Sequence, residues 1–120
     1  MNQATIDNLA KYSYPILRIG LGVVILWFGL NEIINPGMWV SYIPQWALTA
    51  GMSATSLVYI NGTFEIVAAI LLVLGFFPRI VSFLLFLHLL LIIIELGITA
   101  IGVRDFGLAM GFLSLSLYKK

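Results

Sequence analysis

The sequence predicts an all-α integral membrane protein: a four-helix bundle in one domain, residues 1–120, with an interfacial segment between its first two transmembrane helices. Hydrophobic residues make up 62% of the chain and charged residues only 9%, whereas a soluble domain carries about 25% charged residues. The apolar residues fall into four stretches of roughly the length that a helix needs to cross a bilayer. Each stretch is expected to be helical, because an open strand would leave unpaired backbone groups in lipid.

The composition also excludes several kinds of function. The chain has no cysteine, which excludes disulfides, thiolate metal sites and cysteine-based redox chemistry within it. Its net charge of +1 and the lack of a basic stripe argue against nucleic acid as a partner. A metal site at His88, the single histidine, would have to draw further ligands from Glu65 and Glu95, and we expect no metal and no intrinsic cofactor.

The first predicted span covers residues 15–34. It follows a polar segment, residues 1–14, that we expect to form a short helix or a tail at the membrane surface. Pro15 suits the first turn of a helix, where its missing N–H would have no partner in any case. Asn35-Pro36-Gly37 then ends the helix. The span is longer than a signal-peptide core and lacks a small-residue cleavage site, so we interpret it as a retained helix.

Residues 38–56 are too polar, and too interrupted by Pro44 and Gly51, to cross the membrane. Trp39, Tyr42 and Trp46 recur at intervals that would place them on one face of a helix. Tryptophan and tyrosine rings favour the headgroup region of a bilayer. We therefore predict that this segment lies at the membrane interface.

Three further spans are predicted at residues 57–77, 79–97 and 104–118. Basic residues are enriched on the cytoplasmic side of membrane proteins. If both termini are cytoplasmic, five of the six basic residues lie on that side and only Arg104 lies outside. The five are Lys11, Arg18, Arg79, Lys119 and Lys120. We therefore predict cytoplasmic N- and C-termini.

This topology gathers polar side chains from all four spans in the outer half of the bilayer. Ionisable residues are costly within a membrane and usually face a bundle interior or a cavity. The candidate ligand-binding residues are Asn61, Glu65, His88, Glu95 and Arg104. The candidates for structural polar contacts or ion pairs are Asn31, Glu32, Arg18, Arg79 and Asp105, of which the two arginines lie at the cytoplasmic ends of their helices.

Glu65 and His88 are the leading candidates in this set. A carboxyl group at the depth of Glu65 is either neutral or paired with a cation, and Arg104 is the one basic residue on the outer side. We therefore expect a Glu65–Arg104 or a Glu95–Arg104 ion pair, which could equally be a purely structural contact between helices. His88, near the middle of its span, is expected either to bind a quinone head group or to bond a neighbouring group of the protein.

Several short motifs occur in a characteristic order. They are Arg18-x-x-Leu21-Gly22 and Gly29-x-Asn31-Glu32 in the first span, Asn35-Pro36 with Trp39 after it, Gly62-x-x-Glu65, the turn from Gly75 to Arg79, and Asp105. With these motifs the sequence resembles the DoxX family of small four-helix membrane proteins over about residues 14–118. Family members commonly carry a lysine after the last glycine of the first span, where this chain has Asn31 and Glu32.

The resemblance implies a multi-pass protein in the cell membrane of a bacterium or an archaeon. Some relatives of the DoxD type are subunits of thiosulfate:quinone oxidoreductases, which implies a quinone-associated or accessory subunit of a membrane oxidoreductase. Because the chain itself has no electron carrier, this role would need a redox partner protein. The alternative is a non-enzymatic binding, transport or assembly module that recognises a small solute, a lipid or a protein. A homo-oligomer is a further candidate assembly.

Overall fold

The computed structural model describes residues 2–43, 45–48, 51–96 and 98–118, without the side chains of residues 42, 95 and 96. Its long helices are α2 (Ser13–Ile34), α4 (Ala54–Leu74), α5 (Pro78–Leu96) and α6 (Ala100–Leu117). The shorter ones are α1 (Gln3–Ala10), η1 (Pro36–Met38), η2 (Val40–Tyr42) and α3 (Gln45–Leu48). The described part of the chain contains no strand, which confirms the all-α prediction.

The long helices have the dimensions and composition of membrane spans. In the described part of the chain, three helical segments are long and apolar enough to cross a bilayer, namely Gln3–Ile34, Ala54–Leu74 and Ala100–Leu117. The fourth helix, α5, contributes the shorter apolar segment Pro78–Ile94. A helix rises about 1.5 Å per residue, so α5 also approaches the thickness of the hydrocarbon core. The prediction of a helical membrane bundle is confirmed.

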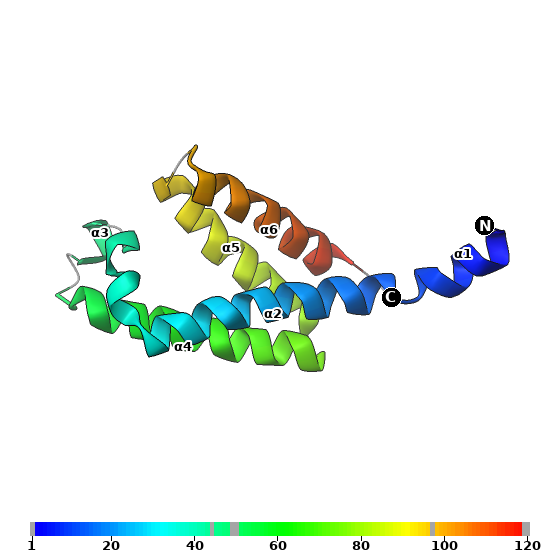
Figure 1. Ribbon diagram of the computed structural model, residues 1–120, viewed down its shortest axis with the longest axis horizontal. Coiled ribbons are helices and arrows are strands. Elements are labelled where there is room, and N and C mark those ends of the chain that lie inside the picture. Colours follow the sequence, from blue (N-terminus) through cyan, green and yellow to red (C-terminus); the bar gives the residue numbers. More distant parts are fainter. Residues whose placement is uncertain (1, 44, 49–50, 97, 119–120) are drawn as a thin grey trace.

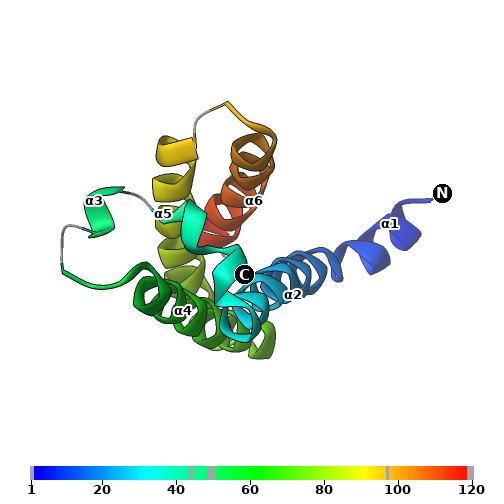
Figure 2. The ribbon, with the colours of Figure 1, turned by 60° about the vertical axis from the view of Figure 1, so that its left-hand side comes forward.

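The bundle consists of two pairs of helices, α2 beside α4 and α5 beside α6 (Figures 1 and 2). One end of the bundle carries the segment 36–53 between α2 and α4 and the turn between α5 and α6. We call it the loop end. At the opposite end, α1 continues outward from α2 (Figure 1), and it has no buried residue. The ring of Tyr14, just inside α2, stacks there on Tyr118 with 4.7 Å between ring centroids.

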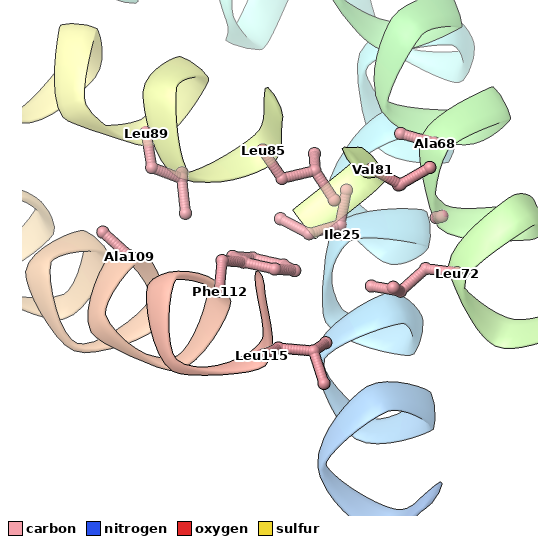
Figure 3. Close-up of a cluster of buried hydrophobic side chains, with 10 residues drawn as sticks. Ile25, Ala68, Leu72, Val81, Leu85, Leu89, Ala109, Phe112 and Leu115 are labelled. Carbon is pink, nitrogen blue, oxygen red and sulfur yellow. The ribbon is translucent and has the colours of Figure 1, made fainter. Parts of the chain in front are cut away.

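A single apolar cluster joins the two pairs (Figure 3). Ile25 of α2 and Leu72 of α4 meet Leu85 of α5 and Phe112 of α6 in this cluster, and each is at most 2% exposed. Close packing of this kind loses stability when a side chain is shortened, because a cavity remains. The cluster occupies the middle of the bundle and leaves the loop end to the polar residues.

Hydroxyl caps and a glycine define the helix ends. The Ser53 hydroxyl accepts the Ser56 N–H at the start of α4 (3.2 Å), and the Thr99 hydroxyl accepts the Gly102 N–H at the start of α6 (3.0 Å). Because Thr99 caps it, α6 begins at Ala100, ahead of the expected residue 104. At the other end of α4, Gly75 has a φ of +89°, which favours glycine and ends the helix before Pro78.

Two arginines satisfy backbone carbonyls at the end of the bundle opposite the loop end. Nη1 of Arg18 donates to the carbonyl oxygens of Leu72 (2.6 Å) and Val73 (2.8 Å), which are among the last in α4. Nε of Arg79 donates to the carbonyl oxygen of Ser116 in α6 (3.1 Å). The last carbonyls of a helix have no partner within it, so these side chains tie neighbouring helices together.

The segment between α2 and α4 differs from the expected single aromatic face. Its described residues form the short helices η1, η2 and α3, so the spacing of Trp39 and Trp46 does not correspond to one face of a continuous helix. Trp46 is 61% exposed, whereas Trp39 is half-buried and lines a cavity of the bundle. The side chain of residue 42 lies outside the described residues. The turn at Asn35-Pro36 directs the beginning of this segment back onto the helices.

Candidate functional site

Helices α2 and α4 approach closely where Gly29 and Gly62 face each other. A Cβ atom on Gly29 would lie 3.0 Å from the carbonyl oxygen of Gly62, and one on Gly62 would lie 3.1 Å from the Cβ of Glu32. Both distances are shorter than ordinary contacts, so the two backbones approach in a way that larger residues would prevent. This contact sets Glu32 of α2 beside Asn61 and Glu65 of α4.

The amide of Asn61 bridges the two carboxyl groups. Its Nδ2 donates to Oε1 of Glu32 (2.7 Å) and to Oε1 of Glu65 (2.6 Å). Both glutamates are buried, with 6% and 5% of their surface exposed. The neutral amide NH2 group of Asn61 therefore bonds two acidic side chains from different helices. We call the carboxyl groups of Glu32 and Glu65 the carboxyl pair.

The second oxygen of each carboxyl group is unsatisfied. Oε2 of Glu32 and Oε2 of Glu65 are buried and have no hydrogen-bond partner in the described part of the chain. Buried polar groups in folded proteins nearly always have a partner, so exceptions call for an explanation. Leaving such a group unpaired costs about 1–3 kcal/mol.

His88 of α5 bonds the carboxyl pair from the other helix pair. Its Nε2 lies 3.2 Å from Oε1 of Glu65, and its ring lies beside that of Phe64, with centroids 5.2 Å apart. The histidine thus has a protein partner at the depth where one was expected. This hydrogen bond links α4 to α5 near the middle of both helices and so joins the two helix pairs of the bundle.

Among the described side chains, Arg104 forms its ion pair with Asp105 and not with Glu65. Arg104 bonds Oδ1 of Asp105 through Nε (3.1 Å) and Nη2 (3.0 Å), and its guanidinium lies 4.8 Å from the centre of the Phe28 ring. Asp105 is the next residue of α6 and is 4% exposed, so Arg104 finds a buried carboxylate without crossing to α4. Glu65 already bonds an amide and an imidazole. The side chain of Glu95, the other expected partner, lies outside the described residues.

A cavity of about 190 Å³ opens beside these groups, between the two helix pairs. Its polar wall consists of Glu32, Asn61, Glu65, Arg104 and Asp105. The remaining wall is apolar and includes the aromatic rings of Phe28 and Trp39. An apolar cavity of about 150 Å³ can hold benzene, so this one has room for a single ring with a small substituent. Arg104 has 47% of its side-chain surface exposed, so its side of the cavity reaches the protein surface.

The DoxX family model matches residues 14–99. The chain belongs to the DoxX family. Neither a curated protein nor a solved structure shows a match to it. The range that matches the DoxX family runs from α2 to the end of α5 and contains the carboxyl pair with Asn61 and His88. Arg104 and Asp105, in α6, lie beyond it.

The structure of this DoxX-family chain brings together most of the candidate ligand-binding residues. Asn61, Glu65 and Arg104 line the cavity. His88 is not among the lining residues but bonds Glu65. The sequence predicted structural contacts for Glu32 and Asp105. In the structure both residues also line the cavity.

One candidate polar residue lies away from the cavity, and two residues outside the predicted set lie at its wall. The side chain of Asn31 is turned to its own helix, where Nδ2 donates to the carbonyl oxygen of Trp27 (2.8 Å). Phe28 and Trp39 were not predicted at the cavity. The signal that could have placed Trp39 is the Asn35-Pro36 turn, because it reverses the chain at the end of α2.

The chemistry of the wall is dominated by hydrogen-bond acceptors. Three carboxyl groups face the cavity against one guanidinium, and that guanidinium is bonded to Asp105. No three acidic or histidine side chains in the described ranges come together in a way that could hold a metal ion. The arrangement therefore suits a molecule that donates hydrogen bonds to the carboxyl pair and covers the apolar wall.

Proposed function

We propose that this DoxX-family membrane protein binds the polar head of a small molecule in the cavity between its helix pairs. The observation that carries the proposal is the pair of unpartnered oxygens, Oε2 of Glu32 and Oε2 of Glu65, beside a cavity with room for one ring. A ligand that donates to these oxygens would remove the free-energy cost of burying them unpaired. Ligand sites typically combine mostly apolar walls with a few convergent polar groups.

The membrane setting suggests how such a molecule reaches the site. Glu32 lies near the loop end of α2 and Glu65 near the middle of α4, and the basic residues favour the loop end as the outer side of the membrane. We propose that both termini are cytoplasmic and that the ligand enters from the outer half of the bilayer, past Arg104. A molecule with an apolar body and a polar head would concentrate there.

The test is whether the protein carries a small molecule when it is extracted in mild detergent, measured by native mass spectrometry. Ile92 lines the cavity, and replacing it by phenylalanine reduces the available volume. Ile94 is on the same helix but is 71% exposed, so Ile94→Phe is the matched control. We expect the wild-type protein and Ile94→Phe to carry the same molecule and Ile92→Phe to lose it. An empty wild-type protein, or equal occupancy in Ile92→Phe, would contradict the proposal.

A second candidate function is that of a quinone-associated accessory subunit of a membrane oxidoreductase. The contact between His88 and Glu65 favours it, because an imidazole bonded to a carboxyl group at the cavity wall provides a route for protons. The cavity also has room for one quinone ring. Electrons would have to come from a redox partner protein, since the chain has no cysteine and a single histidine.

This second candidate is tested by titrating the purified protein with a short-chain benzoquinone and measuring binding calorimetrically. Saturable binding that disappears in Ile92→Phe and weakens in His88→Leu is the expected result for a quinone site. Binding that is unchanged in both variants would show that the quinone partitions into detergent without entering the cavity. In that case the quinone role is removed and the general binding function remains.

A further inference from the structure

We infer that the ligand of this cavity is a primary organic ammonium ion with a small apolar body. This inference rests on the proposed binding function and names the chemical class of the ligand. Two independent features of the cavity lead to it: the balance of charges on its polar wall and the number of hydrogen-bond donors that the wall lacks.

The charge balance follows from the partners of each ionisable group. Asp105 and Arg104 bond each other through two hydrogen bonds and compensate each other. Glu65 has His88 at 3.2 Å as its only basic neighbour in the described residues. Glu32 bonds the neutral amide of Asn61 and makes no ion pair within the described part of the chain. A cation bound beside the carboxyl pair would compensate an ionised Glu32 carboxylate, which matters most in a desolvated site.

The donor count points to the same class of molecule. Oε2 of Glu32 and Oε2 of Glu65 each need a donor, and Asn61 already uses its amino group on the other two oxygens. A primary ammonium group has three donors and no acceptor, so it can satisfy both oxygens at once. A ketone or a carboxylate offers only acceptors, and a single hydroxyl group has one donor.

The remaining wall limits the rest of the ligand. Most of it is apolar, with the rings of Phe28 and Trp39 among its residues, so a bare inorganic cation would leave that surface uncovered. The volume of about 190 Å³ allows a single ring or a short alkyl group beside the ammonium head. Aromatic rings also attract cations, which adds to the preference for a charged head.

Three probes that share one ring test this inference: benzylammonium, benzyl alcohol and benzoate. Their binding to the full-length wild-type protein in lipid nanodiscs is measured by calorimetry at neutral pH. We expect benzylammonium to bind saturably, benzyl alcohol to bind about tenfold more weakly or worse, and benzoate not to bind, because a charge-assisted hydrogen bond is worth about a factor of ten or more. This series needs no variant, so it decides the question even if a substitution in the site prevents folding.

Variants then locate the binding. Glu32→Gln removes the acidic group that can ionise beside a bound cation, and we expect it to weaken benzylammonium binding about tenfold while leaving benzyl alcohol nearly unaffected. Asp7 is an exposed carboxylate of α1, outside the bundle, so Asp7→Asn is expected to change nothing. Ile92→Phe should reduce the binding of both benzylammonium and benzyl alcohol.

The outcomes separate this inference from the function on which it rests. If benzyl alcohol binds as well as benzylammonium, or if Glu32→Gln has no effect, the cavity binds a ring but does not select a cation, and the inference is overturned while the binding function stands. Displacement of benzylammonium by equal concentrations of sodium or potassium ions would also overturn it. If no probe binds and the extracted protein carries no small molecule, both proposals fail.

Discussion

Asn61 is the residue that organises the polar site, because its amino group is shared by carboxyl groups of two helices. Replacing it by leucine, which has a similar size, leaves both carboxyl groups buried without this donor. Hydrogen bonds to charged groups contribute about 1.5–3 kcal/mol each. We expect Asn61→Leu to lower the free energy of unfolding by about 3 kcal/mol or more in an unfolding titration in mixed micelles.

The matched control for this substitution is Asn31→Leu. Within the described residues, Asn31 bonds only the carbonyl oxygen of Trp27 in its own helix, and that carbonyl keeps its place in the helical hydrogen-bond pattern. A loss within about 1 kcal/mol is expected. Equal losses for the two variants would show that Asn61 has no special role in holding the carboxyl pair.

The contact between His88 and Glu65 leads to a separate prediction about a single residue. Its substitution by leucine removes the bond to Glu65 and the polar tie between α4 and α5. We expect the melting temperature in detergent to fall by an amount that corresponds to about 1–3 kcal/mol, because a buried acceptor loses a donor. An unaltered melting temperature would mean that the contact does not stabilise the bundle.

At the scale of helices, the contact between Gly29 and Gly62 determines how close α2 and α4 can lie. A Cβ atom at residue 62 would crowd both the backbone of α2 and the Cβ of Glu32. Gly62→Ala is therefore expected to destabilise the protein by about 1–3 kcal/mol, since overpacking forces backbones apart. Gly107 of α6 has open space around it, and Gly107→Ala should be neutral or stabilising by up to about 1 kcal/mol. Similar effects in both variants would contradict the close helix contact.

The helices themselves were predictable from the sequence, because proline, glycine and the apolar runs mark them directly. The stop after α2 at Asn35-Pro36 and the turn before Pro78 are local signals. The pairing of polar side chains was less predictable. Helical periodicity places Glu65 and His88 on faces of their own helices, but the rotation of one helix against another depends on packing. That is why the sequence offered Glu65 or Glu95 as the partner of Arg104, whereas Arg104 bonds its neighbour Asp105 in α6.

The same limit explains the residues that the sequence did not place at the cavity. Glu32 reaches it because two glycines allow α2 and α4 to approach, and the motif alone does not specify which helix lies opposite Gly29. Trp39 reaches it because the short helix η1 folds back from the end of α2. Both depend on tertiary contacts, whereas the expected interfacial position of Trp39 depended on residue type and on the local spacing of aromatic residues.

At the scale of the whole molecule, orientation in the membrane decides which leaflet the cavity faces. The chain has no natural cysteine, so single cysteines report accessibility without background. We expect Ser41→Cys, which is exposed at the loop end, to react with an impermeant thiol reagent in intact cells. Gln3→Cys, in α1, should react only after lysis. The reverse pattern would place the loop end and the carboxyl pair on the cytoplasmic side.

The central claim is that Glu32 and Glu65, from two helices, form one site through Asn61. A double-mutant cycle tests it most directly: the free energies of unfolding of Glu32→Met, Glu65→Met and the double variant are compared with the wild type in the same micelles. Residues in one hydrogen-bond network typically differ from additivity by about 0.5–3 kcal/mol, and we expect a coupling in this range. Losses that add to within about 0.3 kcal/mol would show two independent side chains and contradict the account.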